Sequence, residues 1–140
     1  MPSQRYVDLK AVREEIGLTQ SEFADMICVS ARTVQSCEQG WRNPSPGVER
    51  SALLLLLAHR HGDALCRHQC WETMGCSLEE RGSCLAFRAK QGHLCWMLSG
   101  NHCQGRRLRS WEDKKGTCLV CPFFRELLPE GVPTRPRAVD

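Results

Sequence analysis

The chain has 140 residues and a mass of 15.9 kDa, enough for one ordinary domain or two small ones. A hydrophobic content of 41% predicts that it folds, and a formal net charge of +3 is too small to establish a nucleic-acid partner by itself. The first ten residues lack an apolar core, and the longest apolar run, 52–58, is far shorter than the ~18 residues of a membrane span. We therefore expect a cytoplasmic protein that does not bind a membrane.

Two short helices are predicted first. Residues 8–17 repeat apolar side chains at three-to-four spacing and end at Gly17, which suits the left-handed turn after a helix. In the next segment, 19–28, Thr19 and Glu22 have the spacing of a capping box and precede a second apolar face.

A third helix, 31–39, follows after a tight turn, with Ser30 as its N-cap and Gly40 as its stop. Short helices joined in this way are typical of a helix-turn-helix. A fourth helix, 46–62, is apolar almost all round, which favours core contacts together with a dimer contact and leaves core contacts alone as the alternative.

The start of the third helix carries residue types that read DNA. An arginine can bond guanine through two hydrogen bonds and a glutamine can read adenine, whereas Thr33 and Arg42 are placed to contact phosphates. An ordinary helical bundle would show the same periodicity, so the pattern alone leaves that alternative open. The candidate DNA-binding residues are Gln20, Ser30, Ala31, Arg32, Thr33, Gln35, Ser36 and Arg42.

This region resembles the Cro/C1-type helix-turn-helix family, in particular the branch found in antitoxin-like autoregulators and in repressors linked to anti-CRISPR genes. The resemblance implies a DNA-binding domain of the five-helix type, over about residues 6–60, that usually acts as a dimer. The family commonly has Trp where this chain has Cys37, so we expect a repacked core, with Trp41 as the candidate to fill the space. The matching residues are Gln20, Phe23-Ala24, Val29-Ser30, Thr33-Val34, Glu38, Gly40 and Pro44.

Cysteine use and charge both change near residue 65. Only Cys28 and Cys37 of the ten cysteines precede it, and the net charge goes from −1 over 1–65 (seven basic, eight acidic) to +4 over 66–140 (twelve basic, eight acidic). A secreted chain would use such cysteines as disulfides, whereas a cytosolic chain more often uses them for metal. The second half has weak periodicity and many glycines, so it needs cross-links or metal to fold.

The cysteine spacing from Cys70 on is C-x5-C-x7-C-x10-C-x7-C-x14-C-x2-C, and its last pair, 118-CLVC-121, can chelate a metal from a single turn. Residues 70–124 resemble a small cysteine-rich module with two Cys-Trp pairs, found in bacterial and archaeal signalling proteins that include chemotaxis receptors. The resemblance implies a sensory or metal-binding accessory domain, without a firmly established cofactor. The candidate metal ligands are Cys70, Cys76, Cys84, Cys95, Cys103, Cys118 and Cys121.

The chemistry leaves the cofactor open. A [4Fe–4S] cluster would use four thiolates, and the Cys121-Pro122 step favours it, with Trp71 and Trp96 as shields. Zinc needs four thiolates, or three and an imidazole, and disulfides or plain thiols are a further alternative. The histidines that could complete a site are His68, His93 and His102.

We expect a mainly α protein: a five-helix-type helix-turn-helix domain at 1–65, a small irregular metal-stabilised module at 66–125, and a flexible tail at 126–140. The predicted function is a sequence-specific, homodimeric transcriptional regulator of double-stranded DNA whose module senses redox or metal state. The alternative is an antitoxin-like autoregulator whose zinc-stabilised half binds a partner protein. An enzyme is disfavoured, because no nucleotide motif or nucleophile–base pair is visible.

Overall fold

A computed structural model of the chain describes residues 5–98, 102–104 and 106–138. The chain divides into two compact units: a first unit of Met1–Arg60 with Val132–Asp140, and a second unit of His61–Gly131. Residues 99–101 and 105, which follow the second Cys-Trp pair at 95–96, and residues 139–140 of the expected tail lie outside the described residues.

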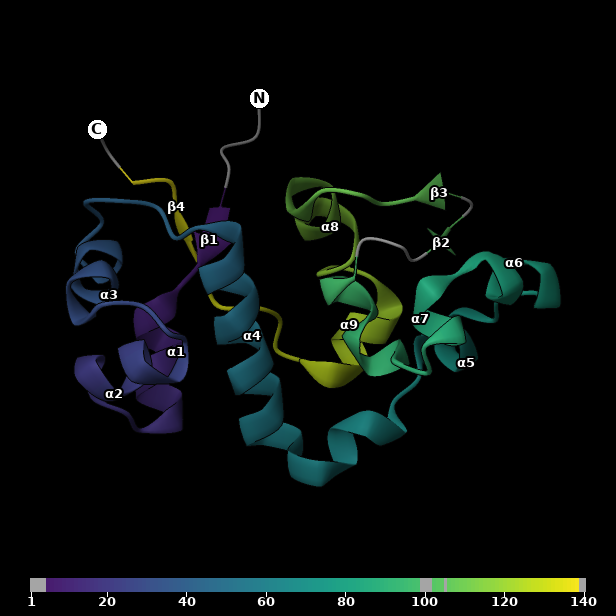
Figure 1. Cartoon of the computed structure of the whole chain (residues 1–140), viewed down its shortest axis with the longest axis horizontal. Helices are drawn as coiled ribbons and strands as arrows, with labels where there is room; N and C mark the ends of the chain where they lie inside the picture. The colour runs from purple at the N-terminus through teal and green to yellow at the C-terminus, as the bar shows by residue number, and fades with distance from the viewer. Residues whose placement is uncertain (1–4, 99–101, 105, 139–140) are drawn as a thin grey trace. The chain divides into compact units, whose positions relative to one another are not determined.

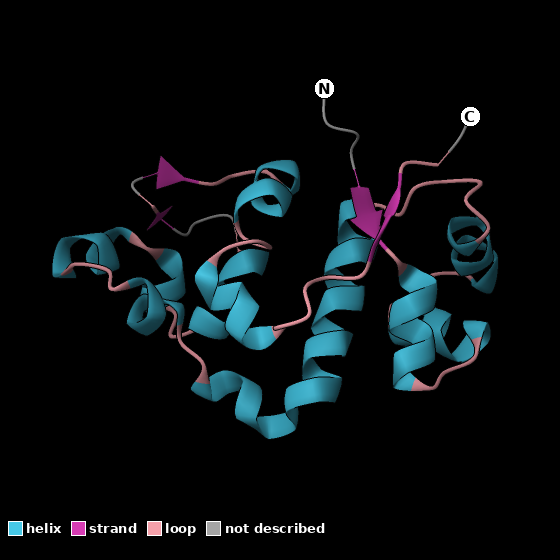
Figure 2. Cartoon of the chain, turned by 180° about the vertical axis from the view of Figure 1, so that it is seen from behind, coloured by secondary structure: helices cyan, strands magenta, loops and turns pink. Residues whose placement is uncertain are grey.

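The first unit places four helices beside a two-stranded sheet (Figure 1). Seen from behind, the two strands again lie side by side, next to the long helix Pro46–His61 (Figure 2). Its elements are β1 (Arg5–Val7), α1 (Leu9–Ile16), α2 (Gln20–Met26), α3 (Ala31–Glu38), α4 (Pro46–His61) and β4 (Thr134–Pro136).

Local signals begin and end these helices where the sequence predicts. The Thr19 hydroxyl accepts from the backbone N–H of Glu22, and the Glu22 carboxylate accepts from the Thr19 N–H, so the capping box of α2 is confirmed. The Ser30 hydroxyl caps α3 in the same way, accepting from Thr33 N–H. Gly17 ends α1 with a φ of 86°, a conformation that L side chains rarely adopt.

Apolar faces of all four helices meet in one core. Val12, Phe23, Val34 and Leu56 are each fully buried, one from each helix. Each such side chain contributes about 1.5–3 kcal/mol relative to an exposed position. The core, rather than helix propensity, therefore holds these short helices in place.

A buried carboxylate links three of the helices. Glu38 of α3 accepts two hydrogen bonds from Arg13 of α1, at 2.8 and 2.9 Å, and one from the side-chain amide of Gln20 of α2, at 3.2 Å. Burial on its own raises the pKa of Glu38, but the hydrogen bonds from Arg13 and Gln20 outweigh it and hold the pKa below the ordinary value. The carboxylate is therefore ionised at neutral pH.

The second unit is a set of short helices and a small hairpin. Its largest buried side chains, Trp96, Phe123 and Phe124, form an aromatic core together with leucines such as Leu127. The elements are η1 (Gly62–Arg67), α5 (Cys70–Met74), α6 (Leu78–Ser83), α7 (Leu85–Arg88), η2 (Gly92–Met97), β2 (His102–Cys103), β3 (Arg106–Arg107), α8 (Trp111–Thr117) and α9 (Pro122–Leu127).

The structure differs from the sequence expectations in several places. The described part of the first unit has four α-helices and a sheet instead of five helices, because the chain after α4 continues as the 3₁₀ helix η1 of the second unit. The second unit is not irregular, since caps such as Ser77 and Ser110 start helices too short to show periodicity. Trp41 does not replace the family's tryptophan in the core, because it is 69% exposed, while Cys37 itself is buried.

The C-terminal segment is the largest difference. Residues 126–140 were expected to be a flexible tail, but Pro122–Leu127 is helical and Thr134–Pro136 pairs antiparallel with β1 as strand β4. Glu49 of α4, fully buried, also accepts a hydrogen bond from the N–H of Val7 in β1 at 3.0 Å, so the sheet is tied to the helical core.

Among the described residues, no helix combines the length and the hydrophobicity that crossing a bilayer requires.

Replacing Arg13 with alanine should destabilise the first unit by about 2–3 kcal/mol at neutral pH, because it leaves the Glu38 carboxylate buried with only Gln20 as a partner. The depressed pKa of Glu38 adds a pH signature: the stabilisation is complete above the ordinary pKa of about 4.5 and is lost as pH falls through the lower folded-state value. Thermal unfolding between pH 3 and 7 should show a smaller acid-side loss for Arg13→Ala than for the wild type.

Arg60→Ala is the matched control. Arg60 contacts Glu15 through the same two guanidinium nitrogens, at 2.8 and 2.7 Å, but these side chains are 25% and 36% exposed. Its loss should cost about 0–1 kcal/mol. Equal effects of the two substitutions would contradict the role given to the Glu38 network.

Candidate functional site

The first candidate site is the exposed side of α3. Ala31, Arg32 and Gln35 are exposed, whereas Val34 and Cys37 face the core, so α3 divides as a recognition helix does. Within the described residues, the side chains of Arg32 and Gln35 make no hydrogen bond or ion pair with the protein. Contacts with base edges would therefore break no interaction of the folded chain.

The other candidate DNA contacts lie in varied environments. Arg42 is exposed and Ser36 is half-buried. The hydroxyls of Ser30 and Thr33 lie 2.9 Å apart and hydrogen-bond each other at the start of α3. Gln20 differs from the rest, because its amide nitrogen is engaged by Glu38.

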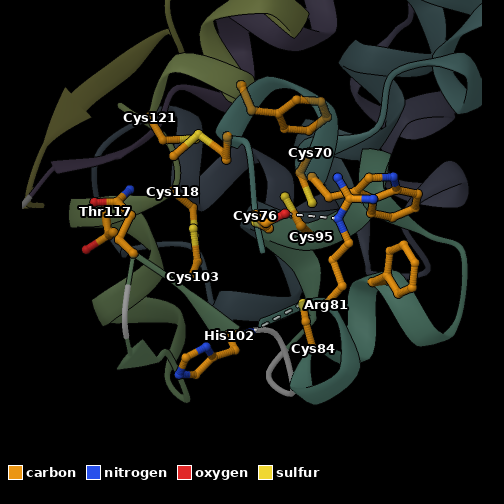
Figure 3. A pocket seen from close by; sticks show the side chains of 15 residues that line it. Cys70, Cys76, Arg81, Cys84, Cys95, His102, Cys103, Thr117, Cys118 and Cys121 are labelled. Carbon is orange, nitrogen blue, oxygen red and sulfur yellow. Dashed lines mark hydrogen bonds between the residues drawn. The ribbon is translucent and has the colours of Figure 1, made fainter. Parts of the chain in front are cut away.

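The second candidate site is a cavity in the second unit, of about 530 Å³ including the part open to solvent. In Figure 3, Cys70, Cys76 and Cys95 gather near the centre, and Cys103 lies next to Cys118. All seven cysteines of the predicted ligand set line this cavity: Cys70, Cys76, Cys84, Cys95, Cys103, Cys118 and Cys121. The three remaining cysteines, Cys28, Cys37 and Cys66, do not line it.

A hydrogen-bonded pair of thiols lies at the centre of the cavity. The bond between Cys70 and Cys95 lowers the pKa of Cys70 and raises the pKa of Cys95 well above its usual range. Burial raises the pKa of Cys103 to about 11, with the nearby Cys118 and Cys121 adding to the shift. Within this pair, Cys70 is therefore the thiol that loses its proton more readily.

Two further sulfurs accept backbone hydrogen bonds. The N–H of Phe124 donates to Cys121 Sγ at 3.4 Å, which makes Cys121 the N-cap of α9, and the N–H of His102 donates to Cys84 Sγ at 3.4 Å. Bonds of this kind stabilise thiolates, and they tune the potential of iron–sulfur centres.

Two basic side chains, Lys114 and Arg81, lie beside the thiols. Lys114 is 2% exposed, and its amine donates to the Cys95 carbonyl at 3.1 Å. Burial lowers the pKa of Lys114, an effect partly offset by the nearby Cys118 and Cys95. Arg81 lines the cavity and donates through Nε to the Cys76 carbonyl at 3.1 Å. These cations would offset the negative charge of thiolates.

The three candidate histidines differ in their position relative to the cavity. His102 lines the cavity, and its Nδ1 is buried with no hydrogen-bond partner among the described residues. His93 Nδ1 is likewise buried without a partner in that part of the chain, but His93 does not line the cavity. His68 packs edge-on against His61, with ring centroids 5.1 Å apart. His102 is therefore the histidine best placed to add a nitrogen donor.

The two predicted shielding tryptophans have different positions. Trp71 lines the cavity and stacks edge-on against Phe87, with ring centroids 4.8 Å apart. Trp96 is fully buried and packs edge-on against Phe124 at 5.9 Å, so it belongs to the aromatic core and not to the cavity lining.

The cavity has suitable donors, but they are not closed on a single ion. In the part of the chain that the structure describes, no three His, Cys, Asp or Glu side chains converge closely enough to hold one metal ion. Zinc draws its sulfur ligands to about 2.3 Å, so binding one zinc ion would require these thiols to move inward. The donor chemistry fits a thiolate-ligated centre, and the seven thiols exceed the four that one zinc ion takes.

The sequence did not predict that Lys114 and Arg81 lie beside the thiols, or that the Gln20 side chain donates a hydrogen bond to Glu38. Lys114 precedes Cys118 by four residues, which places both on one side of α8 and its C-cap, and this spacing is the signal that could have found it. The contacts of Arg81 and Gln20 depend on tertiary packing and have no comparable local signal.

Comparison with protein families finds a match in the first unit. A family model described as helix-turn-helix matches residues 9–48, from the start of α1 to the first turn of α4. No curated protein and no solved structure matches the chain. Residues 9–48 are therefore a helix-turn-helix domain of the Cro/C1 type, which indicates a DNA-binding regulator.

Replacing Gly92 with alanine should destabilise the second unit by about 2–3 kcal/mol, since a Cβ there is an overpacking change against backbone. That Cβ would lie 2.5 Å from Gln69 Oε1, 2.8 Å from the Cys70 nitrogen and 2.9 Å from the Trp71 ring. The close approach places η2, which carries Cys95, against α5, which carries Cys70. Thermal unfolding measures the loss.

Gly116→Ala is the control, because Gly116 lies within α8 with nothing within 4 Å of its Cβ position. Alanine there should stabilise the helix by about 0.5–1 kcal/mol. If Gly92→Ala were as harmless as Gly116→Ala, the close packing of η2 on α5 would be wrong.

Proposed function

We propose that the protein is a sequence-specific transcriptional regulator that binds double-stranded DNA through α3, as a homodimer on an inverted repeat. The observation that carries the proposal is the free, exposed pair Arg32 and Gln35 on α3 of a helix-turn-helix domain. Residues one turn apart on a recognition helix reach neighbouring base edges, and helix-turn-helix dimers bind half-sites about one DNA turn apart.

The roles of the two side chains follow from their chemistry. Arg32 would bond guanine O6 and N7 through its guanidinium, and Gln35 would bond adenine N6 and N7 through its amide. Arg42 and the hydroxyl groups at the start of α3 would contact phosphates, which orient the helix without specifying sequence.

Arg32→Ala and Gln35→Ala should each weaken operator binding by about 1–3 kcal/mol, roughly ten- to a hundredfold, and relax base preference at one position. The operator is first selected from a randomised duplex pool, and affinities are then measured by gel shift at fixed salt. Lys10→Ala, an exposed charge change on α1, is the control and should alter affinity less than about threefold. Wild-type affinity in both α3 variants would contradict the assignment.

We further propose that the cysteine cavity holds a thiolate-ligated metal centre, an iron–sulfur cluster ahead of zinc, and that its occupancy reports metal or redox state. The support is the convergence of seven thiols on one cavity with two N–H···S bonds and a buried cation. Such a centre would cross-link α5, η2 and α9, and binding energy in a small module of this kind is also folding energy.

Protein purified without oxygen should contain iron and acid-labile sulfide, with visible absorption above 400 nm. Ser substitution of Cys70, Cys95 or Cys118 should abolish that content and lower the stability of the second unit. Cys28→Ser is the matched control, since Cys28 is exposed and lies in the first unit. If the purified protein contained zinc and no sulfide, the centre would be a zinc site and not an iron–sulfur cluster. Metal-free protein with normal stability would overturn the metal proposal.

A further inference from the structure

The C-terminal end of α3 is held by a residue from the far end of the chain. Arg135 of β4 donates through Nη1 to the carbonyl of Cys37 at 2.9 Å and to the carbonyl of Glu38 at 2.8 Å. Carbonyls in the last turn of a helix lack their usual partners within it, although the N–H of Gly40 also donates to the Cys37 carbonyl at 3.2 Å. A cation at this end also suits the helix dipole. Arg135 is therefore the C-terminal cap of the candidate recognition helix.

The glycine that ends α3 leaves room for this guanidinium. Gly40 has a φ of 79°, and a Cβ there would lie 3.0 Å from Arg135 Nη2. The turn after α3 and the arginine are thus fitted to one another.

Strand pairing fixes the position of Arg135. Residue 135 is opposite Tyr6 in the β1–β4 register, and Arg5 donates to the Thr134 hydroxyl at 2.7 Å and to the Thr134 carbonyl at 3.0 Å. The N–H of Ala138 donates to the side chain of Asn43, in the loop after α3, at 2.6 Å. Placement of Arg135 therefore requires that β4 be paired.

The chain reaches β4 only through the second unit, residues 61–131. Within that unit, His61 Nε2 and the Leu127 carbonyl are 2.7 Å apart and hydrogen-bonded, so its first residue and its last helix are held together. When the unit is folded, only about five residues separate this bond from Val132. When the unit is unfolded, its whole length of about 71 residues separates α4 from Val132. Because the probability of loop closure scales as the −3/2 power of loop length, β4 pairing becomes roughly 50-fold less probable.

We propose that Arg135 is a positioning residue for α3 and that β4 couples the folded state of the second unit to DNA binding. An ordered second unit keeps β4 paired, Arg135 on α3, and the reading surface in place. A disordered second unit releases β4 and loosens the end of α3. The DNA part of this proposal rests on the function proposed for α3, and the effect on the helix does not.

The test compares Arg135→Ala with Arg137→Ala in the full chain. Arg137 is exposed in the same segment and provides the same change in charge. Hydrogen–deuterium exchange of residues 37–41 measures the end of α3 without DNA, and gel shift measures operator affinity. Arg135→Ala should raise exchange at 37–41 and weaken operator binding, each about tenfold, the size of one to two net hydrogen bonds. Arg135→Lys should restore part of both, and Arg137→Ala should change neither.

Coupling is tested by crossing Arg135→Ala with Gly92→Ala, which disturbs the packing of the second unit and is measured in metal-free protein. Gly92→Ala should speed exchange at 37–41 in the wild-type background and have little further effect when Arg135 is absent. Additive effects, or equal effects of Arg135→Ala and Arg137→Ala, would overturn the proposal. If the wild type bound no operator while the exchange results held, the function proposed for α3 would fail and the coupling would stand.

Discussion

The buried carboxylate of Glu38 is the constraint on which the first unit depends. A carboxylate removed from water costs several kcal/mol unless charged and polar partners surround it. Arg13 and Gln20 provide those partners from α1 and α2, so α3 has one acceptable position against the other two helices. Arg135 donates hydrogen bonds to backbone carbonyls in the same turn of α3. Because these contacts involve only the C-terminal end of the helix, its N-terminal half stays exposed.

The second unit follows a different physical rule. Its apolar core is concentrated in a few aromatic and leucine side chains, and the lining of its cavity combines seven thiols with apolar side chains such as Trp71 and Phe87. Thiols are weak hydrogen-bonding groups, so without further bonding they hold neighbouring helices less firmly than a close-packed apolar interior does. Two backbone N–H groups donate to sulfur and Lys114 is buried beside Cys95, but burial still raises the pKa of thiols such as Cys103 and so favours their neutral form.

The sequence predicts best where the determinants are local. Caps at Thr19 and Ser30 and the left-handed glycines located the helices of the first unit to within a residue or two, and the same periodicity separated the exposed Arg32 from the buried Val34. Cysteine spacing selected the seven side chains that line the cavity, although their role as ligands stays a prediction.

Interactions across long sequence distances were beyond such reasoning. Arg135 contacts residues 97 and 98 positions earlier, and a short proline-containing segment at the chain end has the composition of a flexible tail. Strand β4 forms because β1 and Arg5 are present to receive it, and neither strand is long enough to show an alternating pattern. The short helices of the second unit were not predicted for a related reason, because a helix of five or six residues shows little periodicity.

The paired ends of the first unit have a consequence for proteolysis. A cut between Leu128 and Val132, after the last helix of the second unit, would leave the first unit as two chains held together only by strand pairing and side-chain contacts. Its integrity would then follow mass action, and dilution would separate the short C-terminal fragment from the helices. A nicked sample would bind DNA normally at high concentration and lose binding on dilution, although residues 9–48 were untouched.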